Sequence, residues 1–416
     1  MKKRIVGMIF IVTMLITTMI LPVKSVEAAS INSIKTKDFI KSLVISMKLD
    51  TVSGVSVPYI DAALKAGILT STDFNNNYSG YITRTDAAVL LNRADEYLHG
   101  NTLDEKLLNW VLTKRISDIN KVSKEKREAV AKCVAKGIIK GYSNGYYIQN
   151  RAFRGSEYLT KSAAKAYIKL VVNPAGRAKL SPDGMLIRTT KLPKNAKDYE
   201  YILECYPNKF YEKKFEFMLT ENWKTKRNPD SYAYPVEMKT ETFKNWYTDW
   251  PLIEEMDKHL YEWSAMAEKY LQYVFNVDYR TVGDKWIESL ASLYSKSNVD
   301  YSDHMRTYYI GQMKENNVVV ESSIIAVEPS TLYKDNGEYC MRAYVRYRIF
   351  AIDINVKQSK LIYTQYPALN NLKNGKWREG IFDIRYGTNN GSSGDGSDFT
   401  ISDTSWFIDD FNVPVE

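Results

Sequence analysis

The sequence predicts an α+β protein in two parts: a helical repeat region, followed by a domain in which a pair of helices precedes an antiparallel sheet. Two observations lead to this prediction. In the first part, small and apolar residues recur at three- and four-residue spacing, which is typical of helices that pack closely. Between residues 318 and 349, apolar and polar residues alternate, which is typical of half-buried strands.

The chain opens with the pattern of an export signal. A basic Lys2-Lys3-Arg4 precedes the almost wholly apolar residues 5–21, and Val26-Glu27-Ala28 offers small residues to a signal peptidase. We expect residues 1–28 to be a signal peptide and the mature protein to be secreted. The alternative is a retained anchor, for which this apolar run is short. After cleavage we expect no contact with the membrane.

Composition excludes some partners and cofactors. The mature chain would keep 53 basic and 48 acidic residues, a net charge of +5, which is too mild and too interspersed to indicate nucleic acid. The three histidines form no cluster with ligand spacing, so we expect no metal and no other cofactor. Cys133, Cys205 and Cys340 lie far apart. We expect free thiols, while a Cys205–Cys340 pair stays open.

Two stretches of the first part repeat one pattern. Residues 59–68 and 129–138 each read as a helix of small residues that ends at Gly-Ile. Gly67 and Gly137 stand where a residue in the left-handed conformation would end the helix. Each stretch is followed by a loop and a new helix, so the pattern predicts stacked repeats that bury a shared core.

The helix that follows each loop begins at a threonine. Thr83 and Thr160 suit the N-cap position, and Asp86 adds an acidic partner for Thr83. A third start is expected at Thr36-Lys37, in correspondence with Thr83-Arg84 and Thr160-Lys161. Three such starts predict a pseudo-threefold arrangement.

These residues resemble the S-layer homology family. Residues 137–146, Gly-Ile-Ile-Lys-Gly-Tyr-Ser-Asn-Gly-Tyr, match the turn of that family, and Ile82-Thr83-Arg84-Thr85-Asp86 matches its helix start. The resemblance covers residues 31–173. It implies a three-pronged helical bundle, here residues 30–175, whose grooves bind secondary cell-wall polysaccharide at a Gram-positive cell surface.

The resemblance also implies the binding residues. The arginine of the family's helix start matches Arg84, and Lys161 and Lys37 stand in the corresponding places, beside Thr160 and Thr36. A helix N-terminus and a cation together favour a carboxylate, and arginine can hold it with two bonds. We therefore rank Arg84 first, with Thr83, Thr160 and the two lysines beside it. The alternative is that these cations are only solvated surface charges.

Tyr142 completes the set of candidate binding residues. Its ring could stack on a sugar, although packing of the turn explains it equally well.

The later domain is expected over residues 180–386. Helical spacing predicts helices over residues 252–275 and 282–294, and strands follow, with Arg342, Arg346 and Arg348 on a solvated sheet face. The order is similar to cone-shaped folds of the nuclear-transport-factor-2 type. Residues 387–400 read as a Gly/Ser-rich linker, and the acidic, aromatic tail at 401–416 is expected to be loose, although it could add a strand.

The expected function is non-covalent attachment to cell-wall polysaccharide, with a non-catalytic later domain whose protein partner the sequence does not indicate. One alternative is a wall-anchored enzyme acting on glycans, for which Asp278, Asp284 and Glu288 could supply paired carboxylates. Another is that the repeats are purely structural.

Overall fold

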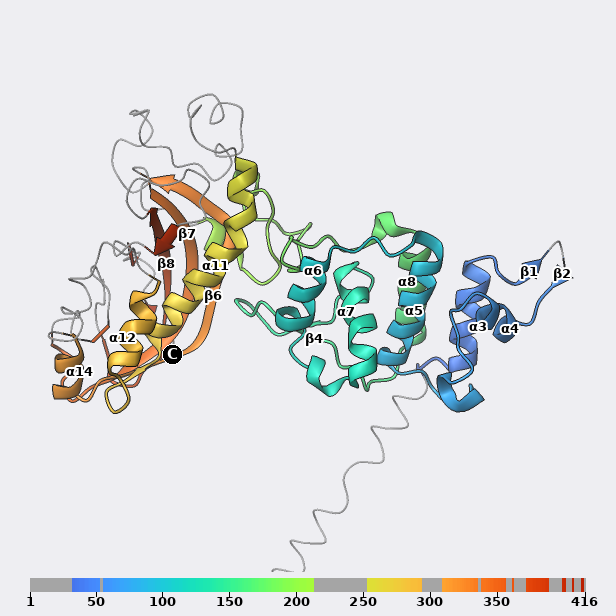
Figure 1. Ribbon diagram of the computed structural model, residues 1–416, viewed down its shortest axis with the longest axis horizontal. Helices are drawn as coiled ribbons and strands as arrows, with labels where there is room; N and C mark the ends of the chain where they lie inside the picture. Colours follow the sequence, from blue (N-terminus) through green and yellow to red (C-terminus); the bar gives the residue numbers. More distant parts are fainter. Residues whose placement is uncertain are drawn as a thin grey trace, which may run out of the picture. The chain divides into compact units, whose positions relative to one another are not determined.

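The computed structural model forms two compact units (Figure 1). The first contains residues 32–143 and 150–184, and the second contains residues 144–149 and those from 185 onward. The structure describes residues 32–52, 55–212, 253–293, 309–335, 338–356, 361–362, 372–388, 399–401, 406–407 and 413–414. The predicted signal peptide and residues 389–398 of the predicted linker lie outside these ranges.

The first unit is built on three helices whose starts meet. These are α3 (Thr36–Ser46), α5 (Arg84–His99) and α8 (Lys161–Val172). Helix α8 packs against both α3 and α5, so the three form one bundle. The connecting elements are α4 (Tyr59–Lys65), η1 (Asp73–Asn76), α6 (Glu105–Trp110), η2 (Val111–Arg115), η4 (Lys124–Lys126), α7 (Arg127–Ala135) and the two-stranded pairs β1 (Thr51–Val52) with β2 (Val55–Ser56) and β3 (Tyr142–Ser143) with β4 (Arg151–Ala152).

A closed ring of backbone hydrogen bonds joins the three helix starts. The N–H of Ile34 donates to the carbonyl of Leu159 at 2.9 Å, that of Leu159 to Ile82 at 2.9 Å, and that of Ile82 to Ile34 at 3.2 Å. All three side chains are buried in the core of the unit. The predicted pseudo-threefold arrangement is therefore present, and it is fixed by main-chain groups that every sequence carries.

The ring shows that the predicted alignment of the first start is wrong by one residue. Lys35, Thr83 and Thr160 occupy equivalent places, as do Thr36, Arg84 and Lys161, whose N–H groups each donate to a neighbouring segment at 2.8 to 2.9 Å. Thr36 is consequently the first residue of its helix, and its hydroxyl donates to the carbonyl of Gly80 rather than capping α3.

The other two threonines cap their helices as predicted. The Thr83 hydroxyl oxygen accepts from the N–H of Asp86 at 3.1 Å and donates to its carboxylate at 2.7 Å. The Thr160 oxygen accepts from the N–H of Ala163 at 3.2 Å, without an acidic partner.

Gly67 and Gly137 end α4 and α7 as predicted. Their φ angles are +69° and +67°. In both copies the isoleucine after the glycine donates to the carbonyl five residues back, the bond of a Schellman motif, and is buried. The two glycines differ in their surroundings, because a Cβ on Gly137 would lie 2.2 Å from the carbonyl oxygen of Ala178, whereas one on Gly67 would meet nothing within 4 Å.

The first unit extends to Gly184, beyond the expected end near residue 175. Asp183 is buried and accepts a hydrogen bond from Arg115 at 2.6 Å, which ties this segment to η2. The Pro182-Asp183-Gly184 turn is therefore part of the packed unit.

The second unit has the predicted order of helices and strands. Helices α11 (Ile253–Phe275) and α12 (Asp284–Ala291) precede the antiparallel strands β6 (Val319–Asp335), β7 (Glu338–Phe350) and β8 (Arg378–Thr388). The sheet runs β10-β8-β7-β6-β5, with β10 at Trp406–Phe407 and β5 at Val277–Asp278. Helix α11 packs against β6 and β7. The shorter helices α9 (Asn208–Glu212) and α14 (Gly311–Glu315) complete it. The α+β fold class is confirmed, while the similarity to cone-shaped folds stays a prediction.

The tail is not loose where the structure describes it. Strands β9 (Phe399–Ile401), β10 (Trp406–Phe407) and β11 (Val413–Pro414) pair one after another with β8, in antiparallel order. The open edge of β8 presents unpaired backbone groups, and the tail satisfies some of them.

The expected solvated face of β7 is wrong for Arg342. This arginine is fully buried, and it donates to the carboxylate of Asp383 at 3.1 Å, directly opposite on β8. Phe210 from α9 covers the same place, since its carbonyl accepts from Arg342 at 3.3 Å. Arg346 and Arg348, further along the strand, are half-buried.

Cys133, Cys205 and Cys340 form no disulfide with one another in the structure. Cys133 is fully buried on α7, and its thiol donates to the carbonyl of Ala88 on α5 at 3.2 Å.

We expect Gly137→Ala to destabilise the first unit more than Gly67→Ala does. The left-handed conformation alone costs alanine about 1–2 kcal/mol, which applies to both variants. The approach of Ala178 should add about 1–3 kcal/mol for Gly137 only. Urea unfolding followed by circular dichroism measures both changes. Equal losses would show that the close approach has no energetic effect.

We also expect Cys133 to make stability depend on alkaline pH. Burial raises the pKa of the Cys133 thiol from 9.0 to about 12. Above pH 9 the unfolded chain loses a proton that the folded protein keeps, so this group lowers the free energy of unfolding as pH rises, by up to about 1.4 kcal/mol per pH unit. Comparing urea unfolding at pH 8 and pH 10, Cys133→Ala should lose less stability than the native chain. An identical loss in both would refute this role.

Candidate functional site

The predicted binding residue Arg84 lies at the start of α5 inside a cage of aromatic rings. Its side chain is almost fully buried, with 4% exposed. Its Nε donates to the carbonyl of Phe153 at 2.9 Å and its Nη1 to the hydroxyl of Tyr167 at 3.1 Å. No carboxylate in the described part of the chain pairs with it. Arg84 is thus a buried cation that is held by neutral groups.

The ring of Tyr142 connects Arg84 to a second arginine. The Arg84 guanidinium lies 4.8 Å from the centre of the ring, and that of Arg154 lies 4.1 Å from it. Tyr142 is 37% exposed, and Arg154 reaches the surface, where Glu157 lies 3.7 Å away. We call Arg84, Tyr142 and Arg154 the first arginine–aromatic cluster.

The backbone of Arg154 is held in an unusual conformation. Its φ is +56°, which is uncommon for a residue with a side chain and is often found at functional sites. The carboxylate of Asp118 accepts from the N–H of Phe153 at 2.6 Å and from that of Arg154 at 2.8 Å. Asp118 thereby positions both residues that flank the cage.

The other predicted residues lie apart from this cluster or cap its helices. Thr83 caps α5 beside Arg84. Thr160 and Lys161 are exposed at the start of α8, and Lys37 is exposed on α3. Thr85, rather than Arg84, is the counterpart of Lys37, because both N–H groups donate to the equivalent place of a neighbouring segment.

Sequence reasoning missed three members of the site, Phe153, Arg154 and Tyr167. They follow the turn or lie two turns into α8, where no motif of the helix start points to them.

A cleft of about 700 Å³ opens on another side of α5, between η1, η4 and α7. Its charged residues pair with one another: Arg93 with Asp73 at 2.5 Å, Lys126 with Asp86 at 2.7 Å, and Lys132 with Glu96 at 3.0 Å. Burial opposes ionisation of Asp73, but hydrogen bonds from Arg93 and Thr70 outweigh it and hold its pKa below the ordinary value. The cations of this cleft are therefore already neutralised.

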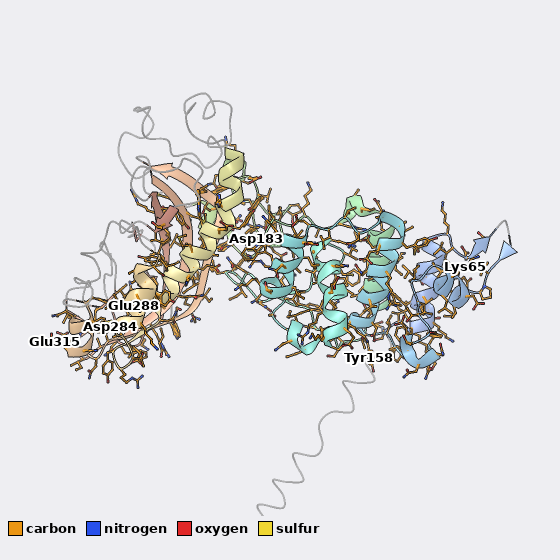
Figure 2. All side chains as sticks on the ribbon, viewed as in Figure 1. Lys65, Tyr158, Asp183, Asp284, Glu288 and Glu315 are labelled. Carbon is orange, nitrogen blue, oxygen red and sulfur yellow. The ribbon has the colours of Figure 1, made fainter. Side chains whose placement is uncertain are left out.

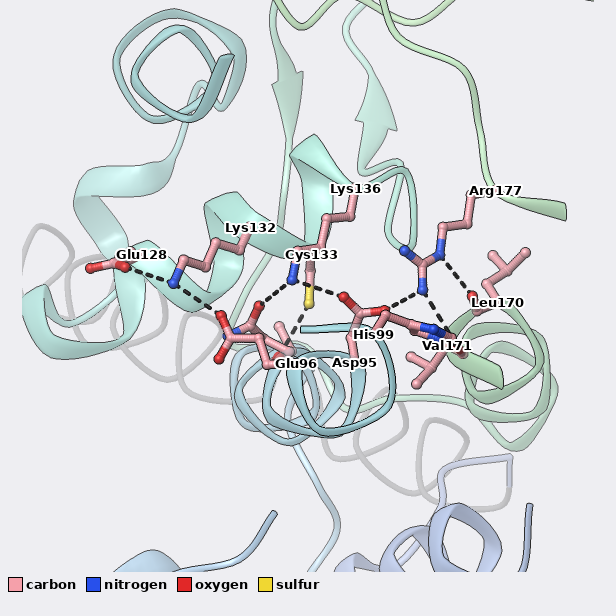
Figure 3. Close-up of polar contacts among 12 residues, drawn as sticks. Asp95, Glu96, His99, Glu128, Lys132, Cys133, Lys136, Leu170, Val171 and Arg177 are labelled. Atoms are coloured by element: carbon pink, nitrogen blue, oxygen red, sulfur yellow. Dashed lines mark hydrogen bonds and ion pairs between the residues drawn. The ribbon is translucent and has the colours of Figure 1, made fainter. Parts of the chain in front are cut away.

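A network of ion pairs supports the wall of the cleft (Figure 3). Asp95 on α5 is buried and accepts from Lys136 after α7 at 2.8 Å and from Arg177 after α8. Arg177 also donates to the carbonyl of Leu170 at 2.8 Å. The network fixes α7 and α8 against α5, so the cleft and the cage share one rigid helix.

The acidic residues considered for catalysis, Asp278, Asp284 and Glu288, all belong to the second unit. Asp278 is held by Arg280, whose Nε lies 2.9 and 3.0 Å from the two carboxylate oxygens. Asp284 and Glu288 are exposed one turn apart on α12 (Figure 2). In the described ranges, no group of three His, Cys, Asp or Glu residues has the geometry of a metal site.

No helix among the described residues is both long and apolar enough to span a bilayer.

A comparison with protein families identifies one part of the repeat region. The model of the S-layer homology domain matches residues 115–164, which include Tyr142, Arg154 and the start of α8 but not Arg84. No curated protein and no solved structure matches the chain. Domains of this family anchor proteins at the cell surface. The chain is therefore an S-layer homology domain-containing protein with a role in cell-surface attachment.

Proposed function

We propose that the protein is exported and attaches non-covalently to an acidic cell-wall polysaccharide through the first arginine–aromatic cluster. The observation that carries the proposal is the burial of Arg84 without a carboxylate partner in the described chain. In this proposal residues 1–28 are removed on export, and the second unit is displayed at the surface without catalysing a reaction.

The surroundings of Arg84 favour an anionic ligand. Removing a guanidinium from water is unfavourable unless hydrogen bonds and an opposite charge replace the lost hydration. Phe153 and Tyr167 accept two of its hydrogen bonds, and no described residue accepts one from Nη2. A carboxylate of a bound sugar would supply both the missing acceptor and the missing charge.

The rest of the cluster suits the same ligand. The partly exposed ring of Tyr142 offers a flat apolar surface for a sugar ring, while Arg154 adds a second cation at the rim. At the two equivalent helix starts stand Thr36 and Lys161, which lack the planar fork of arginine. We therefore place the main binding site at the start of α5, with Lys161, Thr160, Thr83 and Lys37 as secondary contacts.

The second unit is proposed as a display domain because Asp278 is engaged by Arg280, while Asp284 and Glu288 lie one turn apart on a single exposed helix face. The pairing of Asp278 with Arg280 holds the pKa of Asp278 below its ordinary value, which does not suit a general acid. Asp284 and Glu288 face solvent on a single helix rather than flanking a groove.

Binding to wall material tests the proposal. We expect the full mature chain to sediment with isolated wall sacculi and to stay in solution when the secondary polysaccharide has been stripped from them. Arg154→Ala should weaken binding by about tenfold or more, since a hydrogen bond to a charged group contributes about 1.5–3 kcal/mol. Arg154 is exposed, so this variant should remain folded.

The matched control is Lys65→Ala, which removes one positive charge from an exposed site on α4 (Figure 2). It should bind as the native chain does. Equal weakening by both variants would mean that only net charge matters, and sedimentation that survives removal of the polymer would refute the proposed ligand.

A further inference from the structure

The second unit contains an arginine–aromatic cluster of its own. The ring of Trp377, just before β8, has the guanidinium of Arg346 5.0 Å from its centre and that of Arg348 4.7 Å from it. Arg348 also lies 4.9 Å from the ring of Phe350. We call Arg346, Arg348 and Trp377 the second arginine–aromatic cluster. It has the composition of the first cluster, namely one aromatic ring in contact with two arginines.

The cluster lies on the face of the sheet that α11 does not cover. Along β7, Val345, Tyr347 and Ile349 point into the core and are buried, and Arg346 and Arg348 alternate with them on the opposite face. Nearer the start of the strand that face is covered, because the ring of Tyr147 stacks on Tyr344 at 3.5 Å. Beyond Tyr344, the side chains of Arg346, Arg348 and Phe350 on this face are only half-buried, so a ligand can reach them.

The two arginines differ in their charge partners. Arg348 is paired with Glu321 on β6 at 2.6 Å. The guanidinium of Arg346 makes no hydrogen bond or ion pair with any residue that the structure describes, and its ring contact with Trp377 is cation–π in character. A half-buried arginine whose donors meet no acceptor among the described residues can bind an anion.

We propose that the second cluster binds a carboxylate-bearing glycan. The planar fork of Arg346 matches a carboxylate, which can accept two parallel hydrogen bonds, and the half-exposed indole of Trp377 offers a surface for the sugar ring. Arg348 is paired with Glu321, and Glu379, which lies opposite Arg346 on β8, is paired with Lys209 and accepts from the Tyr344 hydroxyl. Arg346 therefore keeps one positive charge, which complements the single carboxylate of one sugar rather than the closely spaced charges of a polyphosphate.

This inference goes beyond attachment through the first unit, because it gives the chain a second point of contact. Two weak sites on one chain bind a repeating polymer more tightly than either site alone when a single polymer spans both. The second site could also operate if the first cluster were purely structural.

Binding of polygalacturonate to the full mature chain tests the proposal. All measurements are made in an Arg154→Ala background, which weakens binding by the first cluster so that it does not mask binding by the second. Adding Arg346→Gln should reduce affinity about tenfold or more, because it removes a charged hydrogen-bond donor. Adding Trp377→Ala should also weaken binding. The thermal unfolding of the Arg346 variant should change little, since among the described residues its guanidinium loses only the contact with the Trp377 ring.

The matched control is Lys376→Gln, which removes an exposed positive charge next to Trp377. It should change affinity less than twofold. Equal weakening by Lys376→Gln and Arg346→Gln would overturn the proposal in favour of bulk charge. The proposal would also be overturned if Arg346→Gln weakened binding of inorganic polyphosphate more than it weakened binding of polygalacturonate. Unchanged affinity in Arg346→Gln would overturn it directly. Loss of wall sedimentation by Arg154→Ala reports on the first cluster alone, so the two proposals can fail separately.

Discussion

The structure of the first unit depends on the ring of backbone hydrogen bonds among Ile34, Ile82 and Leu159. Each bond joins segments that are 48 to 125 residues apart by their numbers, so the ring closes long loops at a high entropic cost. The buried side chains of the same three residues offset that cost. Because the ring brings three helix starts together, it also decides which side chains can share a pocket.

Comparison with two other buried arginines shows what distinguishes Arg84. Arg115 pairs with Asp183 and Arg342 pairs with Asp383, each through a carboxylate that is itself buried. A chain that can place a carboxylate beside these two arginines could place one beside Arg84 as well. It instead places carbonyl, hydroxyl and ring groups there, which hold the side chain in position and leave its charge for another partner.

Local signals in the sequence are sufficient to predict the ends of these helices and the order of the elements. Thr83 and Thr160 cap, and Gly67 and Gly137 end their helices, because these effects involve only neighbouring residues. The errors arose where distant segments decide. The place of Thr36 differs by one residue from the prediction, because only the ring of backbone hydrogen bonds shows which residues of the three helix starts are equivalent. Arg342 is buried because Asp383 and α9 contact it. The tail forms strands because β8 has an open edge with which it pairs. Arg84 could be found from its motif, but Arg154 and Tyr167 reach it only through the tertiary fold.

The origin of the residues around Arg84 has a consequence for the repeats themselves. Arg84 belongs to the repeat that begins near residue 59, whereas Tyr142, Phe153 and Arg154 come from the repeat that the family model matches. Neither repeat contains the site, and the contact between them is fixed by Arg84 N–H donating to Glu157 at 2.8 Å and Thr85 N–H donating to Gly155 at 3.0 Å. Gly155 has no room for a side chain, since a Cβ there would lie 2.3 Å from the Thr85 hydroxyl. The binding groups meet only when two repeats pack against each other, so folding of the bundle also forms the site. A single repeat would contain the motif but not the site.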